Sequence, residues 1–158
     1  MTKAQHISIF SNTTASGSVT PTYGTRQDIG GFNNPVYVAI VDFTQDGKKD
    51  ILVVNKNNGY LGVLVNNTTP GSSIFTFNLQ YFSAMGTPEA VVLGDLNGDD
   101  KIDMVASATN GGLYFHFNYS YPGSGSILFS SFSFYAGGIC NLMLTDLGDG
   151  KTGCYCGS

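Results

Sequence analysis

The sequence predicts an all-β protein built from repeats. Short apolar runs alternate with turns rich in Gly, Asn, Ser and Pro along nearly the whole chain, as expected of strands joined by tight turns. No stretch has the periodicity of an amphipathic helix. One acidic motif recurs at regular intervals, and such internal repetition is typical of repeat architectures.

The recurring motif is an acidic loop of nine residues. At Asp95–Asp103 it places oxygen-bearing side chains at the first, third, fifth and ninth positions, an alternation that lets a short loop turn its ligands onto one hard cation such as Ca²⁺. A second copy is Asp42–Asp50. A third, Asp146–Lys151, is one position short and has glycine at its third position. The first aspartates of the three loops are 53 and 51 residues apart.

The acidic residues are concentrated in these loops. Nine of the eleven lie there, so the rest of the chain is nearly neutral. Two carboxylates ~5 Å apart repel by roughly 3 kcal/mol at an effective dielectric constant of about 20, and a divalent cation between them turns that repulsion into attraction. The alternative is a set of polar turns, because Asp, Asn and Gly favour turns without any ion.

The predicted strands follow in chain order. Residues 6–11 alternate weakly, and residues 19–27 form a poorer strand that Pro21 and Gly24 suit to a sheet edge. From Val36 onward, one apolar strand enters each acidic loop, a second strand leaves it, a tight turn follows, and two more strands complete the unit. The strands of these units are predicted at residues 36–41, 51–54, 60–65 and 74–82, at 90–93, 104–108, 113–117 and 127–135, and at 141–145 and 153–156.

Residues 38–55 and 91–107, each an apolar strand, an acidic loop and a second strand, resemble FG-GAP/VCBS repeats, the blades of integrin-α-like β-propellers. The resemblance covers nearly the whole chain. It implies blades of four antiparallel strands, in which a calcium loop joins the first strand to the second. It therefore predicts two complete blades at 35–87 and 88–138, flanked by complementary half-blades at 1–34 and 139–158 within a single module.

The resemblance also implies a ligand set for each loop. The implied calcium ligands are Asp42, Thr44, Asp46, Lys48 (through its carbonyl group) and Asp50, then Asp95, Asn97, Asp99, Lys101 (carbonyl) and Asp103. Thr44 replaces the usual Asp or Asn, which predicts a weaker first site. Asp100 replaces a glycine that usually has a positive φ, a conformation that Asp tolerates better than most residues. The shortened third loop is not expected to hold an ion.

The two half-blades raise the question of assembly. Closing them within one chain would make a ring of three blades, smaller than closed propellers usually are. Pairing them between chains would make a closed dimer or an open head-to-tail fibre, and the symmetry of the contact decides which. We therefore expect a homo-oligomer or a filament joined by half-blade pairing. The alternative is that the chain is a fragment of a longer propeller.

Three N-glycosylation sequons begin at Asn12, Asn67 and Asn118, with an overlapping one at Asn66. All are expected in exposed turns after the third strand of a blade, where a glycan would fit. Among the cysteines, Cys140 faces two disulfide candidates, Cys154 and Cys156, but only one of them would meet it across a hairpin.

Composition narrows the class of function. The net charge of −4 and the scarcity of basic residues exclude a nucleic-acid binder of the usual basic kind, and no apolar run is long enough to insert into a membrane. No histidine has a sequence neighbour arranged as a nucleophile, which argues against an enzyme. We expect an extracellular or cell-surface calcium-binding module that acts in adhesion or self-assembly. The alternatives are a fragment of a larger receptor or enzyme and a lectin-type propeller whose exposed tyrosines, such as Tyr119, Tyr121 and Tyr135, stack on sugars.

Overall fold

The chain is all-β in its computed structural model, which describes residues 5–84, 86–137, 141–145 and 152–157. No helix occurs among these residues. The strands are β1 (His6–Ile9), β2 (Gln27–Gly30), β3 (Pro35–Val41), β4 (Asp50–Asn55), β5 (Tyr60–Asn66), β6 (Phe77–Ser83), β7 (Pro88–Gly94), β8 (Asp103–Ala108), β9 (Gly112–Asn118), β10 (Phe129–Tyr135), β11 (Asn141–Thr145) and β12 (Gly153–Gly157).

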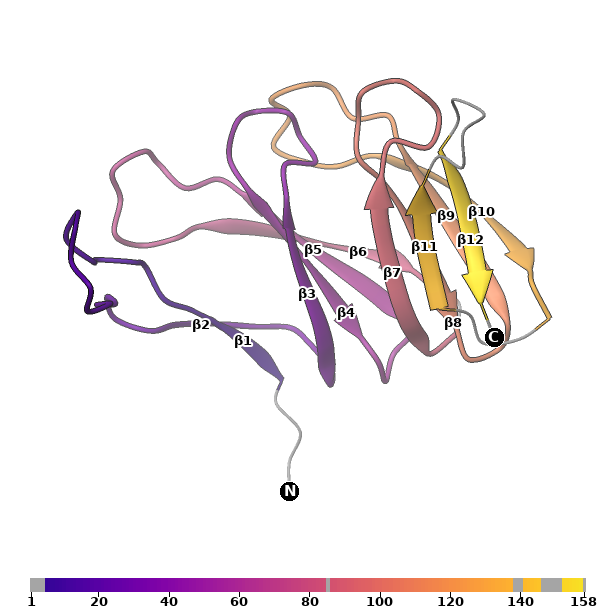
Figure 1. The fold of residues 1–158 in the computed structure, drawn as a ribbon, viewed down its shortest axis with the longest axis horizontal. Coiled ribbons are helices and arrows are strands. Elements are labelled where there is room, and N and C mark those ends of the chain that lie inside the picture. Colours follow the sequence, from indigo (N-terminus) through magenta and orange to yellow (C-terminus); the bar gives the residue numbers. More distant parts are fainter. Residues whose placement is uncertain (1–4, 85, 138–140, 146–151, 158) are drawn as a thin grey trace.

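These strands form two four-stranded antiparallel meanders between two hairpins. The first sheet has the order β3-β4-β5-β6 and the second β7-β8-β9-β10, while β1 pairs with β2 and β11 with β12. Figure 1 shows them as a fan in which β3, β7 and β11 lie side by side and the two hairpins occupy opposite ends. None of these sheets closes on itself.

The core lies between the sheets. The larger apolar cluster joins β4 and β5 of the first sheet, through residues such as Leu52 and Val63, to Met104 and Ala106 on β8 of the second. A smaller cluster joins the opposite face of the first sheet to the β1–β2 hairpin through Ile7, Ile9 and Ile29. Strands β4 and β8 are buried along their whole length, as their nearly continuous apolar sequences predict.

The predicted strand over residues 19–27 is wrong except at its last residue. Strand β2 begins at Gln27, and the preceding segment contributes only one isolated bridge, between Asn12 and Tyr23. The Thr14 hydroxyl accounts for part of the difference, because Thr14 Oγ1 accepts the Thr22 N–H at 2.9 Å and donates to the Thr22 carbonyl. Side-chain bonds of this kind replace the ladder that a strand would need.

A pair of hydrogen bonds from a glutamine side chain joins the β1–β2 hairpin to the first sheet, and an equivalent pair joins the first sheet to the second. The Gln27 amide donates to the Phe75 carbonyl and accepts the Phe75 N–H, at 2.6 and 3.0 Å. The Gln80 amide makes the same pair of bonds with Ile127, at 3.4 and 2.7 Å. Gln27 and Gln80 occupy equivalent positions, since Ile9 opposes the first and Val63 the second.

Membrane crossing by a helix finds no support in this fold. The described residues contain no helix with the length and hydropathy that a bilayer crossing needs.

Candidate metal-binding loops

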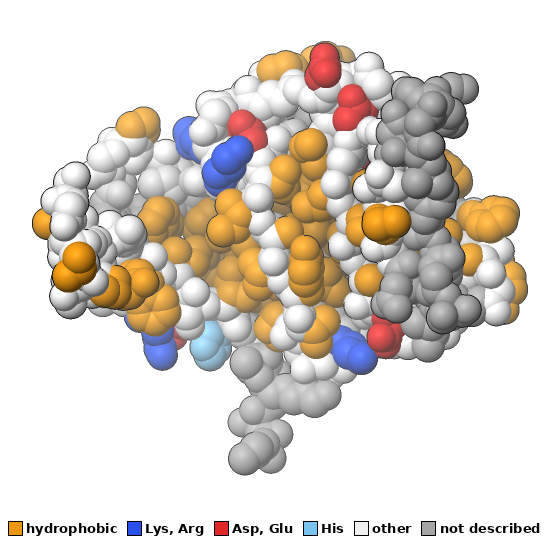
Figure 2. Space-filling view, viewed as in Figure 1, with side chains coloured by type: hydrophobic (Ala, Val, Ile, Leu, Met, Phe, Trp, Pro, Cys, Tyr) orange, Lys and Arg blue, Asp and Glu red, His pale blue; other side chains and the backbone are white. Residues whose placement is uncertain are grey.

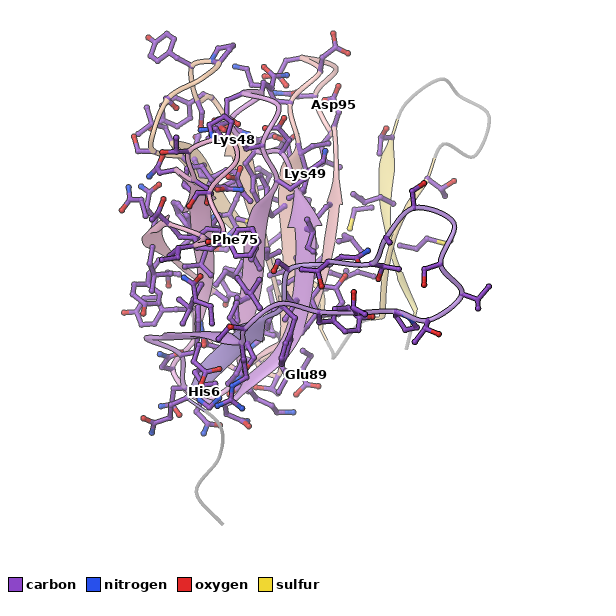
Figure 3. All side chains as sticks on the ribbon, turned by 90° about the vertical axis from the view of Figure 1, so that its left-hand side faces the viewer. His6, Lys48, Lys49, Phe75, Glu89 and Asp95 are labelled. Carbon is purple, nitrogen blue, oxygen red and sulfur yellow. The ribbon has the colours of Figure 1, made fainter. Side chains whose placement is uncertain are left out.

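The two complete acidic loops lie at the same end of the fan. One joins β3 to β4 and the other β7 to β8, and both sit at the top of Figure 1. In Figure 3, Lys48, Lys49 and Asp95 lie at this end, while His6 and Glu89 lie at the opposite end. Because β3 and β7 run in the same direction in neighbouring sheets, their loops emerge together.

In the first loop, the aspartates bind backbone N–H groups of the loop itself. Asp42 accepts bonds from the N–H groups of Asp46 and Gly47, at 3.3 and 2.9 Å, and Asp46 accepts one from Lys48 at 2.8 Å. Two residues have a positive φ, Gln45 at 53° and Gly47 at 82°. These left-handed residues turn the chain tightly around the Asp42 carboxylate.

The second loop repeats this arrangement with more bonds. Asp95 accepts the N–H groups of Asn97, Gly98, Asp99 and Asp100, the shortest at 2.7 Å from Gly98. Those N–H groups lower the pKa of the Asp95 carboxyl group, although partial desolvation alone would raise it. Asp100 has a φ of 63°, so the position where the family pattern has glycine does take the left-handed conformation.

The ninth residue of each loop ties it to the third strand of its sheet. Asp50 accepts the Phe43 and Asn66 N–H groups, both at 2.9 Å, and Asp103 accepts those of Leu96 and Asn118, at 2.9 and 2.8 Å. Both aspartates are fully buried, and burial is the main reason that their pKa values are raised. The charges of Asp42 and Asp46 raise the pKa of Asp50 further, and those of Asp99 and Asp95 raise the pKa of Asp103.

The lysines at the seventh positions place their ammonium groups on the fifth-position aspartates. Lys48 Nζ lies 3.3 Å from Asp46 and Lys101 Nζ lies 3.8 Å from Asp99. Partial desolvation would raise the pKa of Asp46, but the Lys48 N–H and ammonium group outweigh it and lower that pKa. The lysine charges thus partly neutralise both loops.

The loop residues have the chemistry that a hard cation requires, although their carboxylates do not converge. Across the described residues, no three acidic, histidine or cysteine side chains come close enough to form a metal-binding group. In the first loop, however, the Thr44 hydroxyl is buried, with 1% of the residue exposed, and makes no hydrogen bond of normal geometry. It lies near enough to the Asp46 carboxyl group to help lower its pKa. A buried oxygen without a partner, beside carboxylates, fits a cation ligand.

The third loop, at residues 146–151, lies outside the described residues, as does Cys140. The pairing of β11 with β12 places Gly153 opposite Thr145, the position that Asp103 has opposite Gly94. The third loop therefore lacks the ninth-position carboxylate. Among the described residues Cys154 is a free thiol, and burial raises its pKa. The predicted disulfide of Cys140 with Cys154 or Cys156 stays a prediction.

The sequons coincide with a structural turn that occurs three times. Asn12, Asn66 and Asn118 each accept, through Oδ1, the N–H of the Ser or Thr two residues later, at 2.9–3.0 Å. The second member of the series is Asn66 rather than Asn67. The expected exposure is wrong for Asn118, which is buried and donates from Nδ2 to the carbonyl groups of Phe43 and Ile102. Asn12 and Asn67 are exposed, and their glycosylation stays a prediction.

Sequence reasoning missed a cleft between the two sheets. Its volume is about 310 Å³, and Tyr81, Phe82, Tyr114 and Phe132 are among its walls. His116 lines it, and His116 Nδ1 lies 2.7 Å from Ser131 Oγ, whereas the sequence indicated no serine near a histidine. Burial lowers the pKa of His116 to about 4, so the imidazole is neutral near pH 7. Only the pairing of β9 with β10, which sets His116 opposite Ser131, brings these residues together.

The fold and the loops together define a class: an all-β protein of repeated four-stranded meanders, each with an acidic loop between its first two strands. Comparison with known families identifies the repeat. Residues 42–106 match the model of the FG-GAP-like repeat, so the chain contains an FG-GAP-like repeat, as its sequence motif predicted. No curated protein and no solved structure matches the chain.

Proposed function

We propose that the protein is a non-enzymatic, calcium-stabilised propeller-type module that acts outside the cell in adhesion or self-assembly. The single observation that carries the proposal is the pair of matching acidic loops within FG-GAP-like repeat sequence. Each loop connects two strands of one sheet and is tied to a third by its ninth aspartate. A cation bound there would hold three strands together, so its role is structural.

Calcium binding is tested by unfolding the protein with and without the ion. The melting temperature is expected to fall when EDTA removes calcium and to recover when calcium is restored, because an ion that binds only the folded state stabilises it. Magnesium is the control, since a loop of flexible oxygen ligands favours the larger ion. An unchanged melting temperature in EDTA would refute the proposal.

The partner proposed for assembly is another copy of the same chain. The β11–β12 hairpin corresponds to the first two strands of a blade, because Thr145 opposes Gly153 as Gly94 opposes Asp103. The β1–β2 hairpin corresponds to the last two, because its turn and its cross-sheet bond match those of the complete sheets. Pairing β12 of one copy with β1 of another would complete a four-stranded blade. Both are edge strands, which present unpaired backbone groups to a partner.

Carbohydrate binding is the second candidate. It is favoured by Tyr119 and Tyr121, which are exposed on the β9–β10 loop, and by exposed Tyr135 at the end of β10. Aromatic rings of this kind pack against the apolar faces of sugars. Binding to a glycan array that is lost in Tyr121→Ala would support this function, and an array without signal would exclude it.

A further inference from the structure

The outer half of the second sheet carries an aromatic face that no described part of the chain covers. Phe115, Phe117 and Phe132 stack there, with Phe132 lying 4.8 Å from Phe115 and 5.6 Å from Phe117 between ring centroids. Phe134, two residues along the same strand, is 61% exposed. We call Phe115, Phe117, Phe132 and Phe134 the open aromatic face. A cluster of rings in which Phe132 and Phe134 are exposed marks a surface for an apolar partner.

The equivalent surface of the first sheet is covered, and its covering identifies the missing partner. Phe82 occupies on β6 the position of Phe134 on β10, since Leu61 opposes the former and Leu113 the latter. Phe82 packs edge-on against Phe129, at 4.8 Å, and near His116, at 6.3 Å, both from the next sheet. Phe134 therefore needs two side chains at these same positions from a following blade.

The β1–β2 hairpin carries side chains at those positions, and they are exposed. Tyr23 opposes Asn12 as Phe129 opposes Asn118, and Phe10 precedes Asn12 by the same interval as His116 precedes Asn118. Tyr23 is 63% exposed and Phe10 52%. Figure 1 places this hairpin at the end of the fan remote from β10, so it does not reach the open aromatic face of its own chain.

We propose that the β1–β2 hairpin of a second copy packs on the open aromatic face, with its Phe10 and Tyr23 against Phe134. The inference rests on the proposed assembly by half-blade pairing and specifies its contact surface. The β1–β2 hairpin of the second copy would thus add two strands beside β12 and also cover the outer half of the second sheet.

Two differences between equivalent positions of the repeats, one on each side of the junction, support a second copy as the partner. Within the chain, the glutamine contact joins Gln27 to Phe75 and Gln80 to Ile127. At the junction between copies, the glutamine position is Phe132, which opposes Phe115 as Gln80 opposes Val63. The recipient position is Pro21, which has no N–H to donate. Both halves of the polar contact are replaced by apolar residues, which suit packing against each other.

The same docking would complete the second acidic loop. In the first loop, Asn118 Nδ2 donates to the Phe43 carbonyl at 2.9 Å and the Gly123 N–H to the Thr44 carbonyl at 2.8 Å, both from the next sheet. The described residues offer no such donors to Leu96 and Asn97, the equivalent residues of the second loop.

The corresponding donors in the β1–β2 hairpin are Asn12 and Gly17. Asn12 makes the same turn as Asn118, and Gly17 has a φ of 79°, close to the 74° of Gly123. A second copy would bring both to the second loop, so that loop is expected to bind calcium more tightly in the assembled protein.

The other end of the fan is left open in a complementary way. Val38 and Ile40 on β3 are exposed, whereas the equivalent Val91 and Leu93 on β7 pack against the first sheet. Figure 2 shows hydrophobic side chains gathered over this region, between the β1–β2 hairpin and β7. Met143 on β11 is exposed as well. The β11–β12 hairpin of the second copy would lie over Val38 and Ile40 and bury its Met143 there.

The test exchanges the aromatic contact for a charge pair across the junction. Phe134→Glu and Phe10→Lys are prepared separately, and the mass of each in solution is measured by light scattering and sedimentation at 1–50 μM, about the range of a moderately tight complex. Each variant alone should associate at least about tenfold more weakly than the wild type, because a buried ring is replaced by a charge. Mixed in equal amounts, they should associate again, since one junction is then wild-type and the other pairs Glu with Lys.

Tyr121→Glu, an exposed aromatic residue on a loop away from the open aromatic face, is the control and should assemble like the wild type. The far-ultraviolet circular dichroism spectrum of each variant verifies folding, which substitutions at two exposed positions should not affect. A monomeric wild type, or assembly undiminished by Phe134→Glu, would overturn the proposal while leaving calcium stabilisation intact. Two dissociated variants that do not complement each other would also overturn it. Loss of stabilisation by calcium with assembly unchanged would instead refute the proposed metal role.

Discussion

Replacing Asp103 with alanine should destabilise the protein even when no calcium is bound. Asp103 is fully buried, and its two carboxylate oxygens accept the N–H groups of Leu96 and Asn118, at 2.9 and 2.8 Å. It thereby holds the start of its loop against the end of β9. The alanine variant leaves both N–H groups without this acceptor.

The size of the loss follows from those two hydrogen bonds. A buried donor left without a partner costs about 1–3 kcal/mol, so two of them predict a loss of about 2–5 kcal/mol, given that the Leu96 bond is only partly buried. For a chain of this length, that corresponds to a fall in melting temperature on the order of 10 °C. Calcium binding, where it occurs, adds a further loss, because the variant also lacks one ligand.

Asp99→Ala is the matched variant, because Asp99 is exposed and accepts only the Lys101 N–H among these loop contacts. Unfolding is followed by circular dichroism in EDTA and in calcium. In EDTA, Asp103→Ala should lose the full 2–5 kcal/mol, about the cost of two stranded donors, and Asp99→Ala less than about 0.5 kcal/mol. In calcium, both variants should fall below the wild type. A loss under about 1 kcal/mol for Asp103→Ala in EDTA would refute the structural role of its hydrogen bonds.

Three further substitutions each test a different feature of the structure by its effect on stability. Thr44→Val removes a buried hydroxyl without a hydrogen bond, so in EDTA it should stabilise by up to about 1 kcal/mol, and in calcium it should weaken binding to the first loop, as titration calorimetry would detect. Asp100→Gly should raise stability by about 0.5–1 kcal/mol in denaturant titrations, because glycine adopts the φ of 63° without strain. His116 has its pKa lowered to about 4, so the unfolded chain binds a proton that the folded chain does not at intermediate pH, and stability should fall by about 2 kcal/mol between pH 7 and pH 5. His116→Leu introduces the residue that the first sheet has at the equivalent position, since Leu64 opposes Ile51 as His116 opposes Met104, and it should remove that part of the pH dependence.

The acidic loops were predictable because their chemistry is local. Spacing alone identified Asp95 and Asp103 as the ends of one loop, and a turn of fixed length allows few other arrangements of these residues. The sequence also indicated correctly that Asp100, which stands where the family pattern has glycine, has a positive φ. By contrast, the alternating pattern of β10 did not indicate whether Phe132 and Phe134 would be covered, because that depends on a neighbouring sheet rather than on the strand itself.

At the sequons, the local sequence pattern alone does not determine the role of the asparagine, because that role depends on tertiary structure. The Asn-x-Ser/Thr pattern has two physical uses: it is a glycosylation acceptor, and its asparagine oxygen caps the N–H two residues later, as in all three turns here. Asn118 serves the second use, since its amide is consumed by the first acidic loop. In the proposed assembly Asn12 meets the second acidic loop in the same way, so a glycan on Asn12 and association through the β1–β2 hairpin exclude each other. Asn67 lies one residue outside the series, so a glycan on Asn67 is compatible with association through the β1–β2 hairpin.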